Sequence, residues 1–509
     1  MSTTLILALI AAYFAIIFYV TWRTTRHQAP TAKSFAVGDR KSPWWAVAIA
    51  MIGTSISGVT FISVPGMVAA TQFSYLQMVL GFTAGYFAVA YVLLPLYYRL
   101  NLYSIYGYLD QRFGSRSYKV GSVFFLISKF LGCGVRMYLT ALVMQLVLFD
   151  ALGVPFWLNI ALTMLIVWLY TFRGGVKTLV WTDMLQTLCL LLAVVFCIWY
   201  VCRAMGLDGS GLWNAVAGSP MSETWFFSDG NDTRYFWKQF LAGLFTTVAM
   251  TGLDQDMMQK NLSCKNLKEA RKNVISYGFA FLPVNLLFLA LGVLLYQYAA
   301  NLGIFRDGIL TSLTGAPLKS DELFPYLATM TNSDGTPLLP TVVGVLFVLG
   351  LIAAAFSSAG SAVTALTTSV TTDLLQADRK EDESQLSKTR FKVHLVNVLV
   401  MGVLIYLFKV IGNTSVISAV YIVASYTYGP LLGLYIFGLV TKLKPRDGWV
   451  PAICLISPVL SFVIAQNSEA WFNGYKMGYE LLLVNAALTM AGLWLASFRN
   501  SRTTQSASL

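Results

Sequence analysis

Two runs of glycine, serine and threonine interrupt long apolar segments, and their oxygen atoms could bind a cation. Residues 53–60 read Gly-Thr-Ser-Ile-Ser-Gly-Val-Thr, and Pro65 and Gly66 follow them. Residues 353–361 read Ala-Ala-Ala-Phe-Ser-Ser-Ala-Gly-Ser, so their hydroxyls fall on neighbouring faces of one helix. Hard cations prefer several oxygen ligands, and for a monovalent ion neutral carbonyls and hydroxyls suffice. Small-residue packing between membrane helices is the alternative explanation for both runs.

Three ionisable side chains lie inside apolar segments. Asp183 is about two turns into its segment, where an uncompensated charge costs ~2.5–3.5 kcal/mol on insertion scales. We expect it either to lie on an ion pathway or to pair with Arg173 or Lys177 at the end of its helix. Lys129 and Arg136 are two helical turns apart and therefore share a face. They could bind an anionic substrate or neutralise a carboxylate of the protein.

Other polar residues are not expected to do chemistry. Asp254 and Asp256 follow a second glycine- and threonine-rich segment, and we interpret them as ordinary charges at a helix end. His27 falls in a loop and His394 near a helix start, which gives little support to a histidine proton relay. The six cysteines show no CxxC pair and no metal-binding spacing, which favours a packing role.

The segments that must position these residues are membrane helices. The chain has 509 residues, of which 57% are hydrophobic and 11% charged, whereas soluble proteins carry roughly 25% charged residues. Apolar runs long enough to cross a ~30 Å hydrocarbon core recur throughout, without the alternation typical of a barrel. They predict thirteen spans in one domain, at residues 3–22, 44–69, 73–98, 118–148, 153–171, 178–203, 236–258, 274–300, 340–372, 393–412, 414–440, 448–466 and 477–498.

The basic residues orient these spans. Most of the 35 lysines and arginines fall in alternate loops, which the positive-inside rule assigns to the cytoplasm. This predicts an external N-terminus and a cytoplasmic C-terminus, and it accounts for the net charge of +12 without nucleic acid. Two longer segments near 204–235 and 301–339 are acidic, and we expect them to form short surface helices or lids on the outside.

Several motifs in order along the chain resemble the sodium:solute symporter family, which includes sugar, sialic acid, proline and vitamin symporters. The resemblance covers most of the chain, from about Phe35 to Pro451. It rests on Phe35-Ala36-Val37-Gly38, the run ending Thr60-Phe61-Ile62-Ser63-Val64-Pro65, Tyr108-Leu109-Asp110-Gln111-Arg112-Phe113, Gly174-Gly175-Val176 with Val180-Trp181-Thr182-Asp183, Gln255-Asp256-Met257-Met258-Gln259-Lys260, and the Ala-Ala-Ala-x-Ser-Ser run at 353–358.

This resemblance implies an all-α polytopic protein with a 5+5 inverted-repeat core of the LeuT type. An extra N-terminal helix and a cytoplasmic loop would occupy residues 1–43, and the first five-helix repeat residues 44–203. An external loop would follow at 204–235, the second repeat at 236–440, and two C-terminal helices with a short cytoplasmic tail at 441–509.

The resemblance also implies a sodium site between two interrupted helices at the bilayer centre. Carried over by position, its carbonyl and hydroxyl ligands are Gly53, Ile56, Ala354, Ser357 and Ser358. A second sodium, present in some members, would use Asp183 and Ser361 with Ser357. Gly360 replaces a serine of those members, which puts the second ion in doubt.

The substrate positions differ from those of well-known members. Thr60, Thr247 and Met250 stand where sodium/galactose members carry a glutamine, an asparagine and a gating tyrosine. The arginine that holds a carboxylate in sialic acid members falls at Gly132, one turn before Arg136. An acidic solute is therefore compatible with the sequence. The candidate substrate contacts are Ser55, Ser57, Thr60, Gln77, Arg136, Thr247 and Met250.

The sequence thus predicts a sodium-coupled symporter that imports a small polar solute, such as a sugar, a sugar acid or another carboxylate, by alternating access. Its expected partners are sodium, the solute and the lipid of a cell membrane, taken as a bacterial inner membrane; the oligomeric state is left open. The alternatives are an uncoupled or proton-coupled transporter or channel of the same fold, and a transporter-like sensor. About eleven residues follow the last span, which leaves no room for a signalling module. We find no nucleophile–base set or phosphate loop and do not expect an enzyme.

Overall fold

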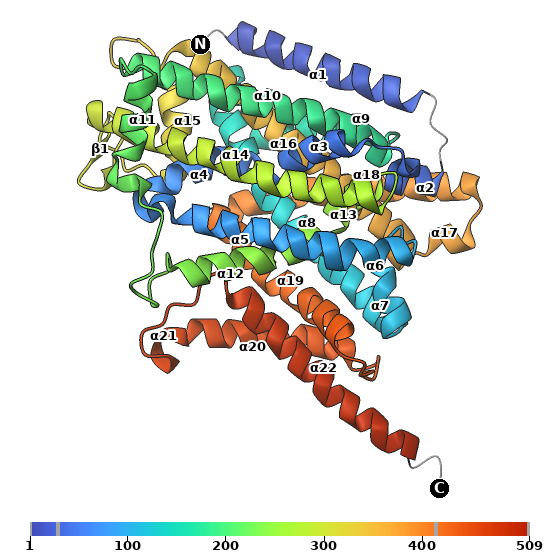
Figure 1. Cartoon of the computed structure of the whole chain (residues 1–509). Helices are drawn as coiled ribbons and strands as arrows, with labels where there is room; N and C mark the ends of the chain where they lie inside the picture. The colour runs from blue at the N-terminus through green and yellow to red at the C-terminus, as the bar shows by residue number, and fades with distance from the viewer. Residues whose placement is uncertain (1–2, 27–30, 412–415, 506–509) are drawn as a thin grey trace.

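The computed structural model describes residues 3–26, 31–411 and 416–505, and helices dominate it (Figure 1). His27 lies outside the described residues. The first ten helices are α1 (Thr3–Thr25), α2 (Ala32–Val37), α3 (Trp44–Ser55), α4 (Gly58–Thr71), α5 (Tyr75–Ala88), α6 (Leu94–Arg99), α7 (Gly107–Arg112), α8 (Ser115–Met144), α9 (Phe156–Thr171) and α10 (Gly175–Ala204).

Twelve helices follow in the second half of the described chain. They are α11 (Gly209–Ala217), α12 (Phe236–Thr247), α13 (Gln255–Leu262), α14 (Leu267–Asn301), α15 (Leu323–Thr329), α16 (Thr341–Ser369), α17 (Ala377–Lys380), α18 (Glu383–Ile411), α19 (Val416–Val440), α20 (Val450–Gln466), α21 (Ser468–Trp471) and α22 (Leu481–Gln505).

Single turns of tighter or wider helix connect or extend several of these elements. The 3-10 turns are η1 (Gly38–Arg40), η2 (Gln72–Ser74), η5 (Asp150–Leu152), η6 (Pro220–Ser222) and η8 (Ser320–Glu322). The π turns are η3 (Val89–Leu93), η4 (Gln145–Phe149), η7 (Val248–Gly252) and η9 (Val370–Leu374).

A small hairpin forms in the predicted external segment 301–339. Strands β1 (Phe305–Arg306) and β2 (Ile309–Leu310) pair antiparallel, with Phe305 opposite Leu310. Asp307 and Gly308 join them with φ angles of 50° and 79°. A two-residue hairpin of this kind needs positive φ at both positions, which Asp-Gly adopts readily.

The predicted spans coincide with helices of the structure. In the described chain, eight helical stretches are long and apolar enough to cross a membrane. Four shorter apolar helices add to them, namely Trp44–Ser55, Phe156–Thr171, Val450–Gln466 and Leu481–Ser497. The polytopic character is confirmed, while the number of thirteen spans stays a prediction.

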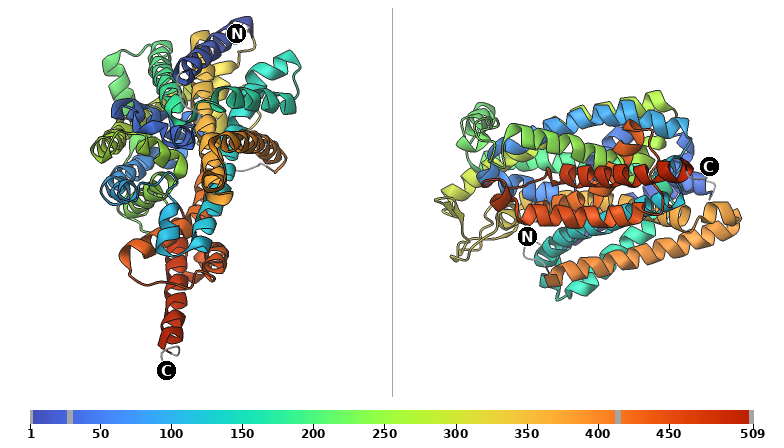
Figure 2. Two further views of the ribbon diagram at one scale, coloured as in Figure 1. Left: turned by 90° about the vertical axis from the view of Figure 1, so that its right-hand side faces the viewer. Right: turned by 90° about the horizontal axis from the view of Figure 1, so that it is seen from below.

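The helices run roughly parallel, so the bundle has two ends. Figure 1 shows α1 beginning at one end and α22 finishing at the other, as an odd number of spans requires. Helices α11 and α15 and strand β1 gather at the end where α1 begins, and α2 and α17 lie at the opposite end. Figure 2 shows α1 and the C-terminal helices at opposite edges of the core. Which end faces the cytoplasm stays a prediction.

The first predicted interruption is present. Helix α3 ends at Ser55 and α4 begins at Gly58, and between them Ile56 and Ser57 are extended, with ψ angles of 93° and 175°. The glycines flank the break instead of forming it. A Cβ atom at Gly53 would lie 2.0 Å from Thr187 Oγ1 on α10, so this glycine permits close helix packing.

A second interruption, which the sequence did not indicate, divides the predicted span 236–258. After η7 the chain leaves the helix at Leu253 and Asp254, and α13 then starts at Gln255. The hydroxyl of Tyr97 donates to the Gly252 carbonyl at 2.8 Å, and that of Tyr106 to the Leu253 carbonyl at 2.9 Å. These tyrosines satisfy carbonyls that the helix end would leave without partners.

The expectation that the second polar run also interrupts its helix, α16, is wrong. Residues 353–361 lie within continuous helix, and all of them are buried. The most apolar window of Thr341–Leu374 is 78% buried, a larger share than for any other long apolar stretch described. The helix packs against α3, α4, α8 and α10. The run is therefore a polar face on a central helix.

Candidate binding site between the helix breaks

A cavity lies where the two interruptions face each other. Its lining comes from α3, α4, α5, α8, the α12–α13 region, α14, α16 and α19. Unwound backbone is tolerated at membrane depth only where it is buried in protein or lines a cavity. The two breaks meet that condition, since Ser57 and Asp254 both border this space.

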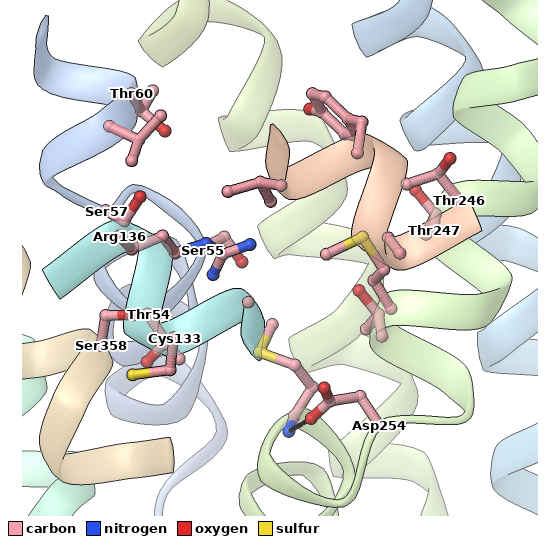
Figure 3. Close-up of a pocket in the computed structure, with 18 of the residues that line it drawn as sticks. Thr54, Ser55, Ser57, Thr60, Cys133, Arg136, Thr246, Thr247, Asp254 and Ser358 are labelled. Atoms are coloured by element: carbon pink, nitrogen blue, oxygen red, sulfur yellow. Dashed lines mark hydrogen bonds between the residues drawn. The ribbon is translucent and has the colours of Figure 1, made fainter. Parts of the chain in front are cut away.

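Six of the seven predicted substrate contacts line this cavity. They are Ser55, Ser57, Thr60, Arg136, Thr247 and Met250. Figure 3 shows Ser55, Ser57 and Thr60 on one side, Thr247 across from them, and Arg136 reaching in from α8. Residues about 190 positions apart in sequence therefore contribute to one polar chamber.

Gln77, the seventh predicted contact, has a different position. Its side chain is fully buried but does not belong to the cavity lining. The Nε2 group donates to the Arg234 carbonyl at 2.8 Å, and Oε1 accepts from the Phe226 amide at 3.2 Å. Gln77 therefore holds the 204–235 segment against α5. In the same segment, hydrogen bonds from the Arg234 guanidinium lower the pKa of the Asp232 carboxyl below its ordinary value.

The two basic residues of α8 have separate roles. Lys129 Nζ lies 2.7 Å from an Asp256 carboxylate oxygen and 3.2 Å from Asp254. The Arg136 guanidinium lines the cavity, and among the residues that the structure describes it has no hydrogen-bond or ion-pair partner. The sequence left two functions open for these residues, namely anion binding and pairing with a carboxylate of the protein. Lys129 has the second function. Arg136 is free to meet an anion.

The expectation that Asp254 and Asp256 are ordinary helix-end charges is wrong. Both are buried, and Asp254 also caps α13 by accepting from the Asp256 and Met257 amides. The Tyr428 hydroxyl on α19 donates to the Asp254 carboxylate. The cluster thus ties α8 and α19 to the second break. The sequence missed it because charges after an apolar run resemble a helix that leaves the membrane.

The predicted sodium ligands lie on the first break and on α16, a helix that packs against α3 and α4. The last carbonyls of α3, including that of Gly53, lie at a helix end where the i→i+4 ladder stops, next to the extended Ile56. Ser358 lines the cavity together with Thr54 and Ser57 (Figure 3). The Ser357 hydroxyl is fully buried and has no hydrogen-bond partner in the described chain. Ala354 lies one turn before Ser358 on the same helix. This donor set of neutral oxygens suits a small monovalent cation.

Asp183, a candidate ligand of a second sodium, forms an ion pair with a lysine of the protein. Lys260 Nζ lies 2.6 Å from its carboxylate, and both side chains are 0% exposed. Ser361, the other candidate ligand of that ion, donates to the same carboxylate oxygen at 2.8 Å. Neither Arg173 nor Lys177 forms this pair. The predicted span 236–258 left Lys260 in the loop that follows it, because nothing in the sequence showed that α13 turns back into the core.

A chain of hydroxyls, which the sequence did not indicate, borders the cavity on the α5 and α14 side. The Ser55 and Tyr277 hydroxyls lie 2.5 Å apart, and Tyr86 donates to Tyr277 at 2.7 Å. All three residues line the cavity. They link the first break to α5 and α14 and give the wall groups that can bind a hydroxylated solute.

Comparison with known proteins agrees with this geometry. A model of the sodium:solute symporter family matches residues 35–449. Sodium/sialic acid symporter NanT of Aliivibrio fischeri is 23% identical over 94% of this chain and 91% of its own length. Sodium-coupled monocarboxylate transporter 2 of Mus musculus is 24% identical over 86% of this chain and 68% of its own length.

Solved structures show the same fold. A Na+-coupled sialic acid symporter in a substrate-bound outward-open state aligns with a TM-score of 0.78 at 20% identity, covering 97% of both chains. Mhp1, a nucleobase-cation-symport-1 family transporter, aligns with a TM-score of 0.52 at 13% identity, covering 92% of this chain and 94% of its own. The LeuT-type helical core expected from the sequence is therefore confirmed.

Proposed function

The chain belongs to the sodium:solute symporter family, and from this premise we propose that it imports a small organic carboxylate together with sodium by alternating access. Its activity is transport and not catalysis. Sodium is the coupling ion, carried as a substrate along with the solute.

The observation that carries the proposal is the meeting of the α3–α4 break with the Ser357–Ser358 face of α16. Transporters commonly place ion sites at discontinuous helices near the bilayer midplane. Here the proposed ligands are carbonyls of Gly53, Ile56 and Ala354 with the two serine hydroxyls. The unpartnered Ser357 hydroxyl supports this assignment, because a buried hydroxyl without a partner is unfavourable unless a ligand satisfies it.

Binding of sodium at this point would couple to the solute through the first break. Ser55 and Ser57 belong both to that break and to the cavity wall. An ion that holds the break in one conformation fixes these hydroxyls for the solute, which is a coupling free energy between two sites. Inward movement of a positive charge is also favoured by ~2.3 kcal/mol per 100 mV of membrane potential.

Arg136 defines the proposed solute class. A guanidinium can bind a carboxylate through two parallel hydrogen bonds, and such charge-assisted pairs are roughly twice as strong as neutral ones. A neutral sugar would leave the Arg136 guanidinium without a direct ionic partner among the described residues. The sialic acid and monocarboxylate symporters among its relatives support the same class. Ser57, Thr60 and Thr247 would then bind polar groups distant from the carboxylate.

The membrane and the orientation are part of the proposal. We place the external 204–235 segment and the N-terminus outside the cell, and the C-terminus in the cytoplasm, in a bacterial inner membrane. The clustering of α11, α15 and β1 at the end where α1 begins supports this arrangement (Figure 1).

Uptake into proteoliposomes tests the function. Radiolabelled N-acetylneuraminate, lactate and galactose would be offered under an inward sodium gradient, or with choline in place of sodium. We expect sodium-dependent accumulation of a carboxylate and none of galactose. Unchanged uptake in choline would contradict sodium coupling, and accumulation of galactose alone would contradict the assignment of the solute class.

A further inference from the structure

A groove with a basic lining lies on the outer surface of the bundle, between η3 at the end of α5 and the start of α14. The residues that line this basic groove are Tyr91, Leu267, Lys268, Arg271, Lys272, Ile275 and Ser276. The set contains three basic side chains and no acidic one. Lys268 and Lys272 are exposed, and neither has an ion-pair partner among the residues that the structure describes. The basic groove therefore has a positive charge that the described chain does not neutralise.

The third basic residue, Arg271, is held in place by the π turn η3. There the Leu94 amide donates to the Val89 carbonyl, five residues back, so the Ala90 carbonyl needs another donor. Arg271 Nε donates to the Ala90 carbonyl at 3.1 Å, and its guanidinium carbon lies 5.1 Å from the centre of the Tyr91 ring. A guanidinium has five N–H donors, and this contact uses one of them. The others can meet an anion from a fixed position.

Exposed apolar side chains continue from the basic groove toward the middle of the membrane. On α14, Ile275 and Phe279 follow Lys272 at intervals of three and four residues, so they share its face. Phe279 is 57% exposed, and its ring centre lies 6.0 Å from that of Phe87 on α5. The Phe87 ring in turn stacks on Tyr91 with 6.5 Å between centres. These three aromatic residues form an aromatic stripe that leads from the groove into the hydrocarbon region.

The groove lies at the end of the bundle that we place in the cytoplasm. Helix α14 finishes next to β1 (Figure 1), so it starts at the opposite end, where α2 and α17 lie. The cytoplasmic leaflet carries anionic lipids, and basic pockets between membrane helices on that side bind their head groups. A phospholipid with a net negative charge matches both parts of the surface. A soluble anion would leave the aromatic stripe without a partner.

We propose that the basic groove binds the phosphate of one anionic phospholipid, whose acyl chain lies along the aromatic stripe. The bound lipid bridges α5 and α14 at their cytoplasmic ends. The same two helices contribute Tyr86 and Tyr277 to the wall of the central cavity. The site therefore links the bilayer to helices that border the solute cavity, and it goes beyond the proposed transport activity.

Native mass spectrometry of the detergent-solubilised protein tests the site with phosphatidylglycerol and with phosphatidylcholine of the same acyl chains. We expect the wild type to bind one phosphatidylglycerol in preference to phosphatidylcholine. Lys268→Gln/Lys272→Gln should bind it about 25-fold more weakly, since each basic residue contributes roughly fivefold. Equal affinity of the wild type for the two lipids would overturn the inference.

The matched control removes the same charge elsewhere at the same end. Lys388 and Lys392 are exposed lysines near the start of α18. We expect Lys388→Gln/Lys392→Gln to keep the wild-type affinity for phosphatidylglycerol. A control that loses as much affinity as Lys268→Gln/Lys272→Gln would show a general attraction to the charged surface and contradict a site at α14.

A conservative variant separates a built site from charge alone. Arg271→Lys keeps the charge but lacks the planar fork that can hold the Ala90 carbonyl and a phosphate together. We expect phosphatidylglycerol to bind about fivefold more weakly, as for the loss of one hydrogen bond. Unchanged affinity would contradict the role of η3.

A head group without acyl chains distinguishes a lipid from a soluble phosphate. Glycerol 1-phosphate, added at the same concentration as the lipid, should not displace phosphatidylglycerol from the wild type. Displacement would show that the groove takes a soluble phosphate, and the lipid assignment would fail. All these measurements are made without transport, so their outcome does not depend on the proposed uptake.

Discussion

Lys129 on α8 lies 2.7 Å from the Asp256 carboxylate on α13, and the same ammonium contacts Asp254 at the second helix break. One cation is therefore shared by two buried carboxylates beside the cavity. Arg136, two turns further along the same helix, has its guanidinium in the cavity and no such partner in the described chain. Substitutions of Lys129 and Arg136 should therefore have different effects.

Lys129→Met should destabilise the fold. Removal of one partner from a buried ion pair typically costs ~3–5 kcal/mol, because the remaining charges stay buried without compensation. We expect a lower melting temperature of the detergent-solubilised protein, measured by the fluorescence of its tryptophans. Lys119→Met, an exposed lysine of the same helix, should melt like the wild type. Equal melting temperatures for Lys129→Met and wild type would show that the pair does not stabilise the fold.

Arg136→Gln should impair solute binding while the fold is kept. Loss of a hydrogen-bonded charge costs ~1.5–3 kcal/mol, which corresponds to roughly 10- to 150-fold in affinity. We expect the KM for the carboxylate to rise by that factor, with little change in melting temperature without solute. Arg136→Lys should recover only part of the loss, since an ammonium cannot bind the carboxylate bidentately. A carboxylate KM that is the same in Arg136→Gln and wild type would exclude Arg136 from the solute site.

Ser358→Ala should weaken sodium activation more than it weakens solute recognition. Removal of one hydroxyl ligand should raise the sodium concentration for half-maximal uptake by roughly 5- to 30-fold, equivalent to ~1–2 kcal/mol. Thr364→Val is the control, because its hydroxyl donates to the Gly360 carbonyl within the same helix. The two variants should differ clearly in uptake measured against sodium concentration. Matching curves for Ser358→Ala and Thr364→Val would argue against a ligand at Ser358.

Gly53→Ala should disturb the packing of α3 on α10. The new methyl group would lie 2.0 Å from Thr187 Oγ1, and overpacking of this kind typically costs ~1–3 kcal/mol. We expect a lower melting temperature for the single variant and a partial recovery in Gly53→Ala/Thr187→Ala, where the colliding hydroxyl is absent. If the second change gives no recovery, the close approach of these helices is not the reason for glycine at position 53.

The sequence predicted the membrane helices from the length of the apolar runs, and the first helix break from the polar residues inside one of them. The helix break at Ile56–Ser57 followed from hydroxyls and glycines inside an apolar segment, although Gly53 turned out to serve packing. The break at Leu253–Asp254 could not be found, because an apolar run followed by charges is also typical of a helix that reaches the membrane surface. For the same reason the predicted span 236–258 ended before Lys260, which is buried in the structure.

The pairing of buried charges also needed the structure. Periodicity put Lys129 and Arg136 on one face of a helix, but it could not show which of them meets a carboxylate of the protein. That choice depends on α13 and α19, which are more than 100 residues away in sequence. The predicted solute contact at Gln77 also needed the structure. Its buried amide bonds to backbone groups of the 204–235 segment and does not line the cavity.

Direct measurement of bound sodium tests the central claim, which is that neutral oxygens of the first break and α16 hold a coupling sodium ion. Equilibrium binding of radioactive sodium to purified protein, with solute present, should be saturable in the wild type and fall sharply in Ser357→Ala/Ser358→Ala. Undiminished binding in the double variant would contradict the account.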